Sequence, residues 1–141
     1  YLSGELNAAM LAFLLAASLL AFLFYNRYPS KIFGGDSLTY MIGAAAATVA
    51  VIGNIEKFAA LIFLLWFAEL ALKLRRINSA QNFGILQDDG TLKAPYERPY
   101  SLTHVVMNLG RFKEQEIVLI LVLAQVVITL VMFSLVYYSI L

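Results

Sequence analysis

Residues 117–141, IVLILVLAQVVITLVMFSLVYYSIL, form an uncharged stretch of 25 residues. A transmembrane helix needs roughly 20 apolar residues to cross the hydrocarbon layer of a bilayer. The whole 141-residue chain has a similar character, because 62% of its residues are hydrophobic and only 13% are charged. Few water-soluble domains could keep so much apolar surface away from water. The sequence therefore predicts an all-α integral membrane protein.

Three segments upstream are also candidates for membrane crossing. Residues 6–25 and 37–55 carry no formal charge. Residues 58–72 are shorter and contain Glu69, but a helix there becomes long enough if it begins near Asn54 and the Lys73 amine reaches the interface. We therefore predict a single membrane segment, 1–141, with four transmembrane helices at about 6–25, 37–55, 54–73 and 117–141 and a connecting loop at about 74–116.

The basic residues indicate the orientation of these helices. Arg27 and Lys31 fall in the first loop, seven more fall in or beside the 74–116 loop, and only Lys57 falls on the opposite side. Cytoplasmic loops of membrane proteins are enriched in Lys and Arg. We therefore expect a multi-pass protein whose first loop and 74–116 loop face the cytoplasm, with the lipid bilayer and no nucleic acid among its partners.

The 74–116 loop contains a hairpin signal. In GILQDDGTLKAPY, residues 84–96, an Asp-Gly pair is flanked by short alternating runs, the strongest local pattern for a β-hairpin. Asp88 and Asp89 could be read as a metal-binding pair, but turn chemistry explains them better. The sequence therefore predicts a small β-hairpin in this loop.

Downstream of the hairpin, SLTHVVMNLG at residues 101–110 can form a short amphipathic segment with Ser101 as a cap and Gly110 as a stop. His104, the single histidine of the chain, has two interpretations, a polar surface residue or a functional one. Arg75 and Arg76 likewise suit either anchoring at lipid headgroups or binding of a ligand phosphate.

The first loop and its helix, YPSKIFGGDSLTYMIG at residues 28–43, place polar residues in an otherwise apolar chain. Asp36 could be an N-cap of the second helix. It could also be functional, because an ionisable group at the mouth of a membrane helix is a functional candidate by default. Gly34 and Gly35 allow the backbone to approach a ligand, and the helix N-terminus favours an anion or an anion-bound metal. Mg²⁺ fits such a site, since it takes one or two carboxylates plus substrate phosphates.

The stretch YNRYPSKIFGGDSLTYMIG resembles the Tyr-Pro-Ser-x-x-Phe-x-Gly-Asp-Thr motif of the polyprenyl-phosphate N-acetylhexosamine-1-phosphate transferases. The eukaryotic dolichyl-phosphate enzymes and their archaeal relatives are the nearest in pattern, and a Phe-x-Gly-Asp core is shared with the bacterial enzymes that act on phospho-MurNAc-pentapeptide. LGRFKEQEIVLILVL is similar to the entry of the last helix in the dolichol enzymes. APYERPYSLTH is similar in position to a His-rich cytoplasmic stretch of the bacterial enzymes, which favours a functional His104.

This resemblance implies a membrane enzyme of family 4 glycosyltransferase type, in the plasma or endoplasmic reticulum membrane, with its active face in the cytoplasm. A polyprenyl or dolichyl phosphate would attack the β-phosphorus of a UDP-amino sugar, with UDP-GlcNAc the expected donor, and UMP would leave. By the resemblance Asp36 is a Mg²⁺ ligand and His104 a catalytic residue. We expect substrate binding from the basic and loop residues Lys31, Gly35, Arg75, Arg76 and Arg98.

Two departures from the family pattern qualify this expectation. The dolichol enzymes carry an Arg-His-Arg cluster where this chain has NSAQNFG, residues 78–84, so its role would pass to Arg75, Arg76 or Arg98. The family's Asp-Asp motif and nucleotide loop lie in an N-terminal half that has no counterpart here. We therefore expect the C-terminal portion of a larger enzyme, inactive without its N-terminal half. The alternative is a non-catalytic four-helix membrane scaffold or partner-binding subunit.

Overall fold

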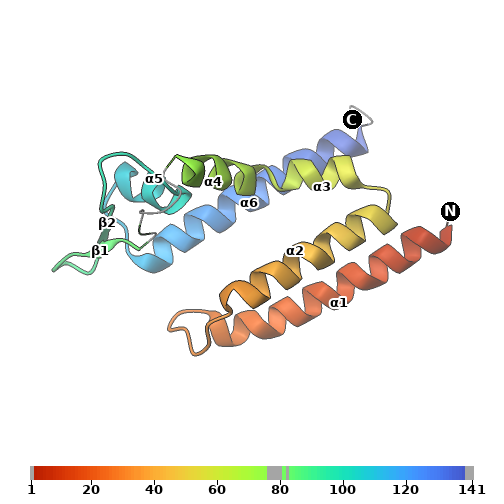
Figure 1. The fold of residues 1–141 in the computed structure, drawn as a ribbon, viewed down its shortest axis with the longest axis horizontal. Helices are drawn as coiled ribbons and strands as arrows, with labels where there is room; N and C mark the ends of the chain where they lie inside the picture. The colour runs from red at the N-terminus through yellow and green to blue at the C-terminus, as the bar shows by residue number, and fades with distance from the viewer. Residues whose placement is uncertain (1, 76–80, 82, 139–141) are drawn as a thin grey trace. The chain divides into compact units, whose positions relative to one another are not determined.

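The computed structural model describes residues 2–75, 81 and 83–138, and these residues are mostly helical (Figure 1). The chain divides into two compact units, residues 1–60 and 61–141, and each is described by itself below. In chain order the elements are α1 (Leu2–Asn26), α2 (Gly35–Ile52), α3 (Glu56–Ile62), α4 (Leu64–Leu74), β1 (Ile85–Leu86), β2 (Leu92–Lys93), α5 (Leu102–Leu109) and α6 (Glu114–Tyr137).

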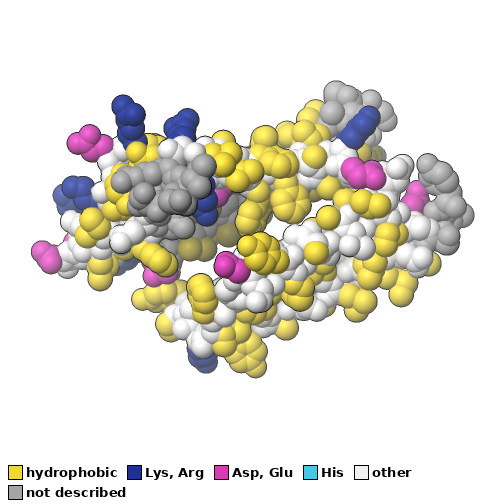
Figure 2. Space-filling view, in the orientation of Figure 1, with side chains coloured by type: hydrophobic (Ala, Val, Ile, Leu, Met, Phe, Trp, Pro, Cys, Tyr) yellow, Lys and Arg dark blue, Asp and Glu magenta, His cyan; other side chains and the backbone are white. Residues whose placement is uncertain are grey.

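Three helices among the described residues are long and apolar enough to cross a membrane, namely Gly4–Asn26 within α1, α2 and α6. Their large side chains are mostly exposed, as Phe13 in α1 and Leu130 in α6 illustrate at 74% and 61%. Figure 2 shows hydrophobic side chains along the outer surfaces of the helices and charged side chains towards the helix ends. Such surfaces suit lipid rather than water. The prediction of a helical membrane protein is confirmed.

The first unit is built on a pair of antiparallel helices, α1 and α2, packed side by side (Figure 1). Small residues allow the two helices to approach each other, since Ala8 and Ala50 are buried between their neighbours. A Cβ added to Gly53 would lie 3.2 Å from the Ala8 Cβ. Close backbone approach through small residues is the usual way in which membrane helices pack.

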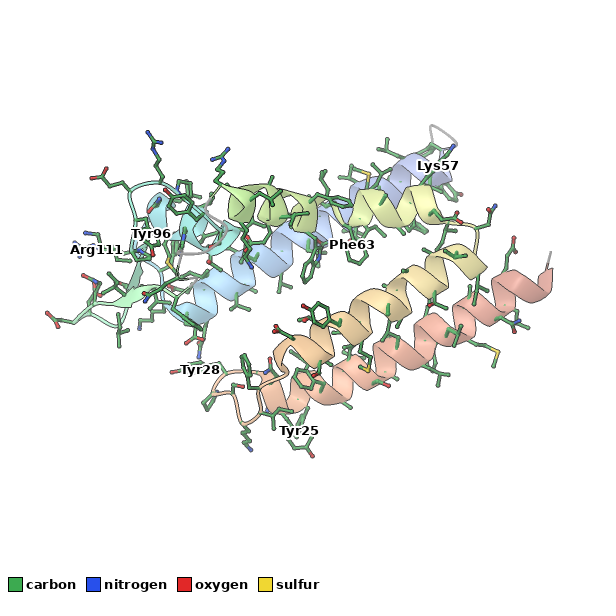
Figure 3. The ribbon with its side chains drawn as sticks, viewed as in Figure 1. Tyr25, Tyr28, Lys57, Phe63, Tyr96 and Arg111 are labelled. Carbon is green, nitrogen blue, oxygen red and sulfur yellow. The ribbon has the colours of Figure 1, made fainter. Side chains whose placement is uncertain are left out.

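Where the sequence predicted one helix at 54–73, the structure has two, α3 and α4, which meet at Phe63 (Figure 3). The side-chain amide of Gln125, on α6, donates a hydrogen bond of 2.9 Å to the Ile62 carbonyl at this break. A side chain that inserts into the backbone hydrogen-bond ladder is a recognised cause of a helix break, and it keeps the freed carbonyl satisfied in apolar surroundings. Neither α3 nor α4 alone reaches spanning length.

The second unit has a small apolar core where α5 packs against α6 and β2. Its buried members are Ala94, Val106, Met107 and Ile117. The hairpin beside it is antiparallel, with Ile85 opposite Lys93 and Leu86 opposite Leu92. The predicted hairpin is therefore confirmed. It is tied to the start of α6 because the Leu92 N–H donates to the Phe112 carbonyl at 2.8 Å.

Candidate functional site

The loop between α1 and α2 is held in shape by its own polar groups. The Asn26 side-chain amide donates to the Ile32 carbonyl at 2.8 Å and to the Ser30 hydroxyl at 3.3 Å. The Ser30 hydroxyl donates to the same Ile32 carbonyl at 2.8 Å, and the Lys31 N–H donates to the Tyr25 carbonyl at 2.9 Å. Figure 3 shows Tyr25 and Tyr28 at this end of the helix pair. The loop therefore leads into α2 along a defined path.

Two glycines form the entry to α2. Gly34 is the N-cap residue, and a Cβ there would lie 2.5 Å from the Leu38 Cδ2 and 3.2 Å from the Phe22 Cζ. Gly35 has φ +59°, the left-handed region in which glycine is favoured. The absence of side chains at these two positions therefore favours this tight entry.

Asp36 follows in the first turn of α2, where it is exposed. The structure does not show the capping role considered for it, because the N-cap is Gly34 and no side-chain hydrogen bond caps this helix. The polar contact at this turn is instead the Thr39 hydroxyl, which donates to the Asp36 backbone carbonyl at 2.9 Å. The Asp36 carboxylate is thus not used to cap the helix that carries it.

A pocket of about 310 Å³ opens beside this turn, lined by Phe22, Asn26, Phe33, Gly34, Gly35, Asp36, Leu38 and Thr39. Its rim combines the exposed carboxylate with apolar surface, and Phe33 is 92% exposed. Lys31 lies in the same loop and is exposed, although it does not line the pocket. Among the residues that the structure describes, no three His, Cys, Asp or Glu side chains gather closely enough to hold a metal ion. Asp36 can therefore supply one carboxylate ligand but does not form a metal centre with other described side chains.

The second set of candidate residues centres on α5. His104 is completely buried, its Nδ1 accepts a long hydrogen bond of 3.4 Å from the Tyr100 N–H, and the Tyr96 ring meets it edge-on at 6.0 Å. Within the described part of the chain, Nε2 has no partner in hydrogen-bonding geometry. Burial lowers the pKa of the His104 imidazole below its usual 6.5, and the Glu69 carboxylate and the Gln81 backbone oppose that shift. The ring is therefore biased towards the neutral form.

The start of α5 is fixed by two oxygen acceptors. Ser101 is the N-cap, as predicted, and its hydroxyl accepts from the His104 N–H at 3.3 Å. The second acceptor comes from α4, where the Glu69 carboxylate accepts from the Leu102 N–H at 2.6 Å. The sequence pattern assigned no role to Glu69, although an acidic residue inside an apolar segment is itself a signal of function.

The basic candidates lie on the surface of the second unit. Arg75 is the C-cap residue of α4 and is exposed, and Arg98 is exposed in the segment between β2 and α5. Arg76 and most of the NSAQNFG stretch lie outside the described residues. The pocket beside α2 brings Gly35 and Asp36 together, whereas Arg75, Arg98 and His104 belong to the other unit.

Asp89 is part of the hairpin turn. Its carboxylate accepts from the Thr91 hydroxyl at 2.6 Å and from the Thr91 N–H at 3.0 Å, and it lies 3.6 Å from the Arg111 guanidinium. These hydrogen bonds, with a smaller contribution from Arg111, hold the pKa of the Asp89 carboxyl below its usual 3.8. A role in the hairpin turn therefore accounts for the Asp89 carboxylate, which is the interpretation that the sequence favoured over a metal-binding pair.

Comparison with known proteins identifies relatives of the chain. Residues 1–54 match the model of glycosyl transferase family 4. A candidate UDP-N-acetylglucosamine–dolichyl-phosphate N-acetylglucosaminephosphotransferase of Saccharolobus solfataricus is 40% identical over 115 residues, and one of Sulfolobus acidocaldarius is 36% identical over 114. These alignments cover 82% and 81% of this chain but only 35% and 34% of the relatives.

A bacterial phospho-N-acetylmuramoyl-pentapeptide-transferase, from a Thermoanaerobacter species, is 39% identical over 70 residues, which are 50% of this chain and 22% of the relative. The archaeal and bacterial matches are the two groups that the first loop resembles. The predicted resemblance to the polyprenyl-phosphate sugar-1-phosphate transferases is confirmed. The chain spans about a third of the length of the archaeal relatives that it matches.

Proposed function

We infer, from the relationship of this chain to the polyprenyl-phosphate sugar-1-phosphate transferases, that it is part of an enzyme with that activity. The enzyme would transfer N-acetylhexosamine 1-phosphate, with UDP-GlcNAc as donor, to a polyprenyl or dolichyl phosphate. An oxygen of the lipid phosphate attacks the β-phosphorus of the UDP-sugar, the bond between the β-phosphorus and the bridging oxygen breaks, and UMP leaves with that oxygen on its phosphate. The products are UMP and a lipid-linked sugar diphosphate.

The observation that carries this proposal is the exposed carboxylate of Asp36, which makes no hydrogen bond or ion pair within the described part of the chain. It lies in the first turn of α2, beside a pocket and directly after two glycines, where no side chain covers the backbone. The helix N-terminus contributes positive potential that attracts the phosphate groups of a substrate. A cation between them would offset the repulsion between an anionic substrate and this carboxylate.

Mg²⁺ suits that role, because it is usually bound by one or two carboxylates together with substrate phosphates and water. Asp36 would hold it from this chain, and when bound it would neutralise charge on the diphosphate and the departing UMP. We propose that further carboxylates come from polypeptide corresponding to the remaining two thirds of the archaeal relatives, including an N-terminal half. This chain would then be a C-terminal portion, inactive alone.

The other candidate residues receive roles consistent with their positions. Gly35 would let the substrate approach the backbone, and Lys31 would attract its phosphates from the same loop. Arg75, Arg76 and Arg98 would supply positive charge to the nucleotide diphosphate, in place of the family's Arg-His-Arg cluster. Burial favours the neutral form of His104, and its Nε2, which has no hydrogen-bond partner among the described residues, would bind a ligand group.

The membrane arrangement follows the same proposal. We propose that α3 and α4 together form a fourth crossing, interrupted at Phe63, so that the α1–α2 loop and the 74–116 loop face the same side. That side carries nine of the ten basic residues. It would be the cytoplasmic face of the plasma membrane or the endoplasmic reticulum membrane, where nucleotide sugars are available.

The experiment measures UMP release from UDP-GlcNAc by the full-length protein, with polyprenyl phosphate and Mg²⁺ present. Asp36→Asn should reduce kcat/KM by about 100-fold or more, because it removes a metal ligand. The matched control is Glu56→Gln, an exposed carboxylate in the first turn of α3, which should keep the wild-type rate. A full rate for Asp36→Asn would refute the metal role, and a wild-type protein that releases no UMP would refute the activity.

A further inference from the structure

Glu69 makes a contact that neither membrane insertion nor the local sequence explains. It lies in the apolar helix α4, and its Oε2 accepts a hydrogen bond of 2.6 Å from the backbone N–H of Leu102, which lies 33 residues further along the chain. Its other oxygen, Oε1, pairs with the Lys73 amine at 3.2 Å. Both carboxylate oxygens therefore have partners, and one partner belongs to a different helix.

The donor of this bond, the Leu102 N–H, lies in the first turn of α5. The first N–H groups of a helix have no acceptor within the helix, so an outside oxygen must satisfy them. Ser101 accepts from the His104 N–H at a rather long 3.3 Å, and Glu69 accepts from the Leu102 N–H at a shorter distance. A carboxylate also complements the positive end of the helix dipole. Glu69 is thus the charged acceptor at the N-terminus of α5.

Leu102, the residue that donates to Glu69, precedes the buried His104 by two residues in α5. We propose that Glu69 is a positioning residue for His104, because its hydrogen bond to the Leu102 N–H fixes the first turn of α5 and so the place of the imidazole. The inference rests on the proposed function in giving His104 a role with substrate. Glu69 itself touches neither substrate nor reacting atoms in this scheme and acts through the helix that it holds.

The ring itself has few polar restraints, of which the interaction with the Gln81 backbone is one, so the position of its own backbone matters. Its Nδ1 accepts the long bond from the Tyr100 N–H, and Nε2 has no partner among the described residues. A small rotation or fraying of the first turn of α5 would therefore move the imidazole directly. In active sites, misplacement of a group by about 1 Å can reduce the rate by two orders of magnitude.

The test uses three variants of the full-length protein. Glu69→Ala removes the acceptor, Glu69→Gln keeps an amide oxygen that can still accept from Leu102, and Lys73→Met removes the ion pair but leaves the carboxylate. We expect Glu69→Ala to lower kcat about five- to tenfold, in line with the loss of a helix cap, with KM changed less than about twofold. Glu69→Gln and Lys73→Met should stay within about twofold of the wild-type kcat.

Hydrogen exchange of the α5 amides supplies a readout that does not depend on activity. Glu69→Ala should accelerate exchange at residues 102–105 about tenfold, whereas Glu69→Gln and the surface control Glu97→Gln should not. An unchanged exchange rate in Glu69→Ala overturns the proposal. So does accelerated exchange with a wild-type kcat, or a loss in Glu69→Gln as large as in Glu69→Ala.

The two proposals fail in distinguishable ways. If the wild-type protein releases no UMP, the proposed function is wrong, and the exchange measurement alone decides whether Glu69 holds the first turn of α5. If the wild-type protein is active, a drop in kcat that Glu69→Gln restores separates positioning from a general loss of folded protein. A general loss would lower the folded fraction measured by size exclusion and would leave kcat per folded molecule unchanged.

Discussion

Gly35 offers a direct test of how the backbone shapes the entry to α2. Its φ of +59° lies in the left-handed region, and the nearest atom to an added Cβ is a Phe33 ring carbon at 3.8 Å. A methyl group would therefore meet ordinary van der Waals contact, and only the backbone conformation would resist it. For an L-residue other than glycine that conformation costs about 1–2 kcal/mol, so Gly35→Ala should lower the free energy of unfolding by about that amount.

A second glycine in the same helix provides the matched control. Gly43 is inside α2, and a Cβ added there meets no atom within 4 Å. Glycine in a helix interior is less stable than alanine by roughly 0.5–1 kcal/mol, so Gly43→Ala should raise stability by that amount. Replacement of glycine by alanine should thus lower the free energy of unfolding at Gly35 and raise it at Gly43, eight residues further along the chain.

The measurement is unfolding in mixed micelles of increasing SDS content, followed by circular dichroism. Gly35→Asn completes the series, because asparagine tolerates the left-handed region better than alanine. The expected order of stability is Gly43→Ala above wild type, then Gly35→Asn, then Gly35→Ala. The reasoning is refuted if Gly35→Ala equals the wild type or exceeds Gly35→Asn. We also expect Gly35→Ala to reduce kcat/KM for UMP release, since it disturbs the turn that carries Asp36.

Two further outcomes follow from polar groups in the second unit. Gln125→Leu should destabilise the protein by about 1–2 kcal/mol, because the Ile62 carbonyl loses its donor. SDS unfolding should show this, with the exposed Gln115→Leu as a control, and an unchanged midpoint would contradict it. Since burial lowers the pKa of His104 in the folded protein, protonation favours the unfolded state. The contribution of neutral His104 to the free energy of unfolding should therefore be fully present above pH 6.5, the ordinary pKa of histidine. It should fall as pH drops below that value, by at most about 1.36 kcal/mol per pH unit. His104→Gln should remove this slope, and a slope that persists in the variant would assign it to other groups.

The elements that the sequence predicted correctly depend on strong local signals. Uncharged apolar runs marked α1, α2 and α6, and the Asp-Gly pair marked the hairpin, because both signals act through neighbouring residues alone. Ser101 as the cap of α5 is of the same kind. In the candidate site, the sequence identified the Gly35–Asp36 turn, and the structure shows a pocket there.

The features that the sequence did not predict depend on contacts between distant segments. The break at Phe63 coincides with a hydrogen bond from Gln125, which lies on another helix. In the sequence Glu69 is only a charge that interrupts an apolar run, yet in the structure its carboxylate accepts a hydrogen bond from the N–H of Leu102. The capping role considered for Asp36 failed because the helix begins earlier, at glycines whose backbone geometry a sequence pattern does not specify. Tertiary structure decided each of these points.

The bond between the Leu92 N–H and the Phe112 carbonyl also sets where foreign sequence can be added. The bond joins the two ends of residues 92–112, the segment that contains α5, into a closed loop, which we call the ring. The hairpin tip lies outside this ring. Gly90, at the tip, has φ +78° and open space around it. Because the entropy cost of closing a loop grows with its length, an epitope or fluorescent peptide inserted at the tip would leave the ring unchanged. The same insertion between β2 and α5 would lengthen the ring and weaken its closure, so the hairpin tip is the place for a reporter.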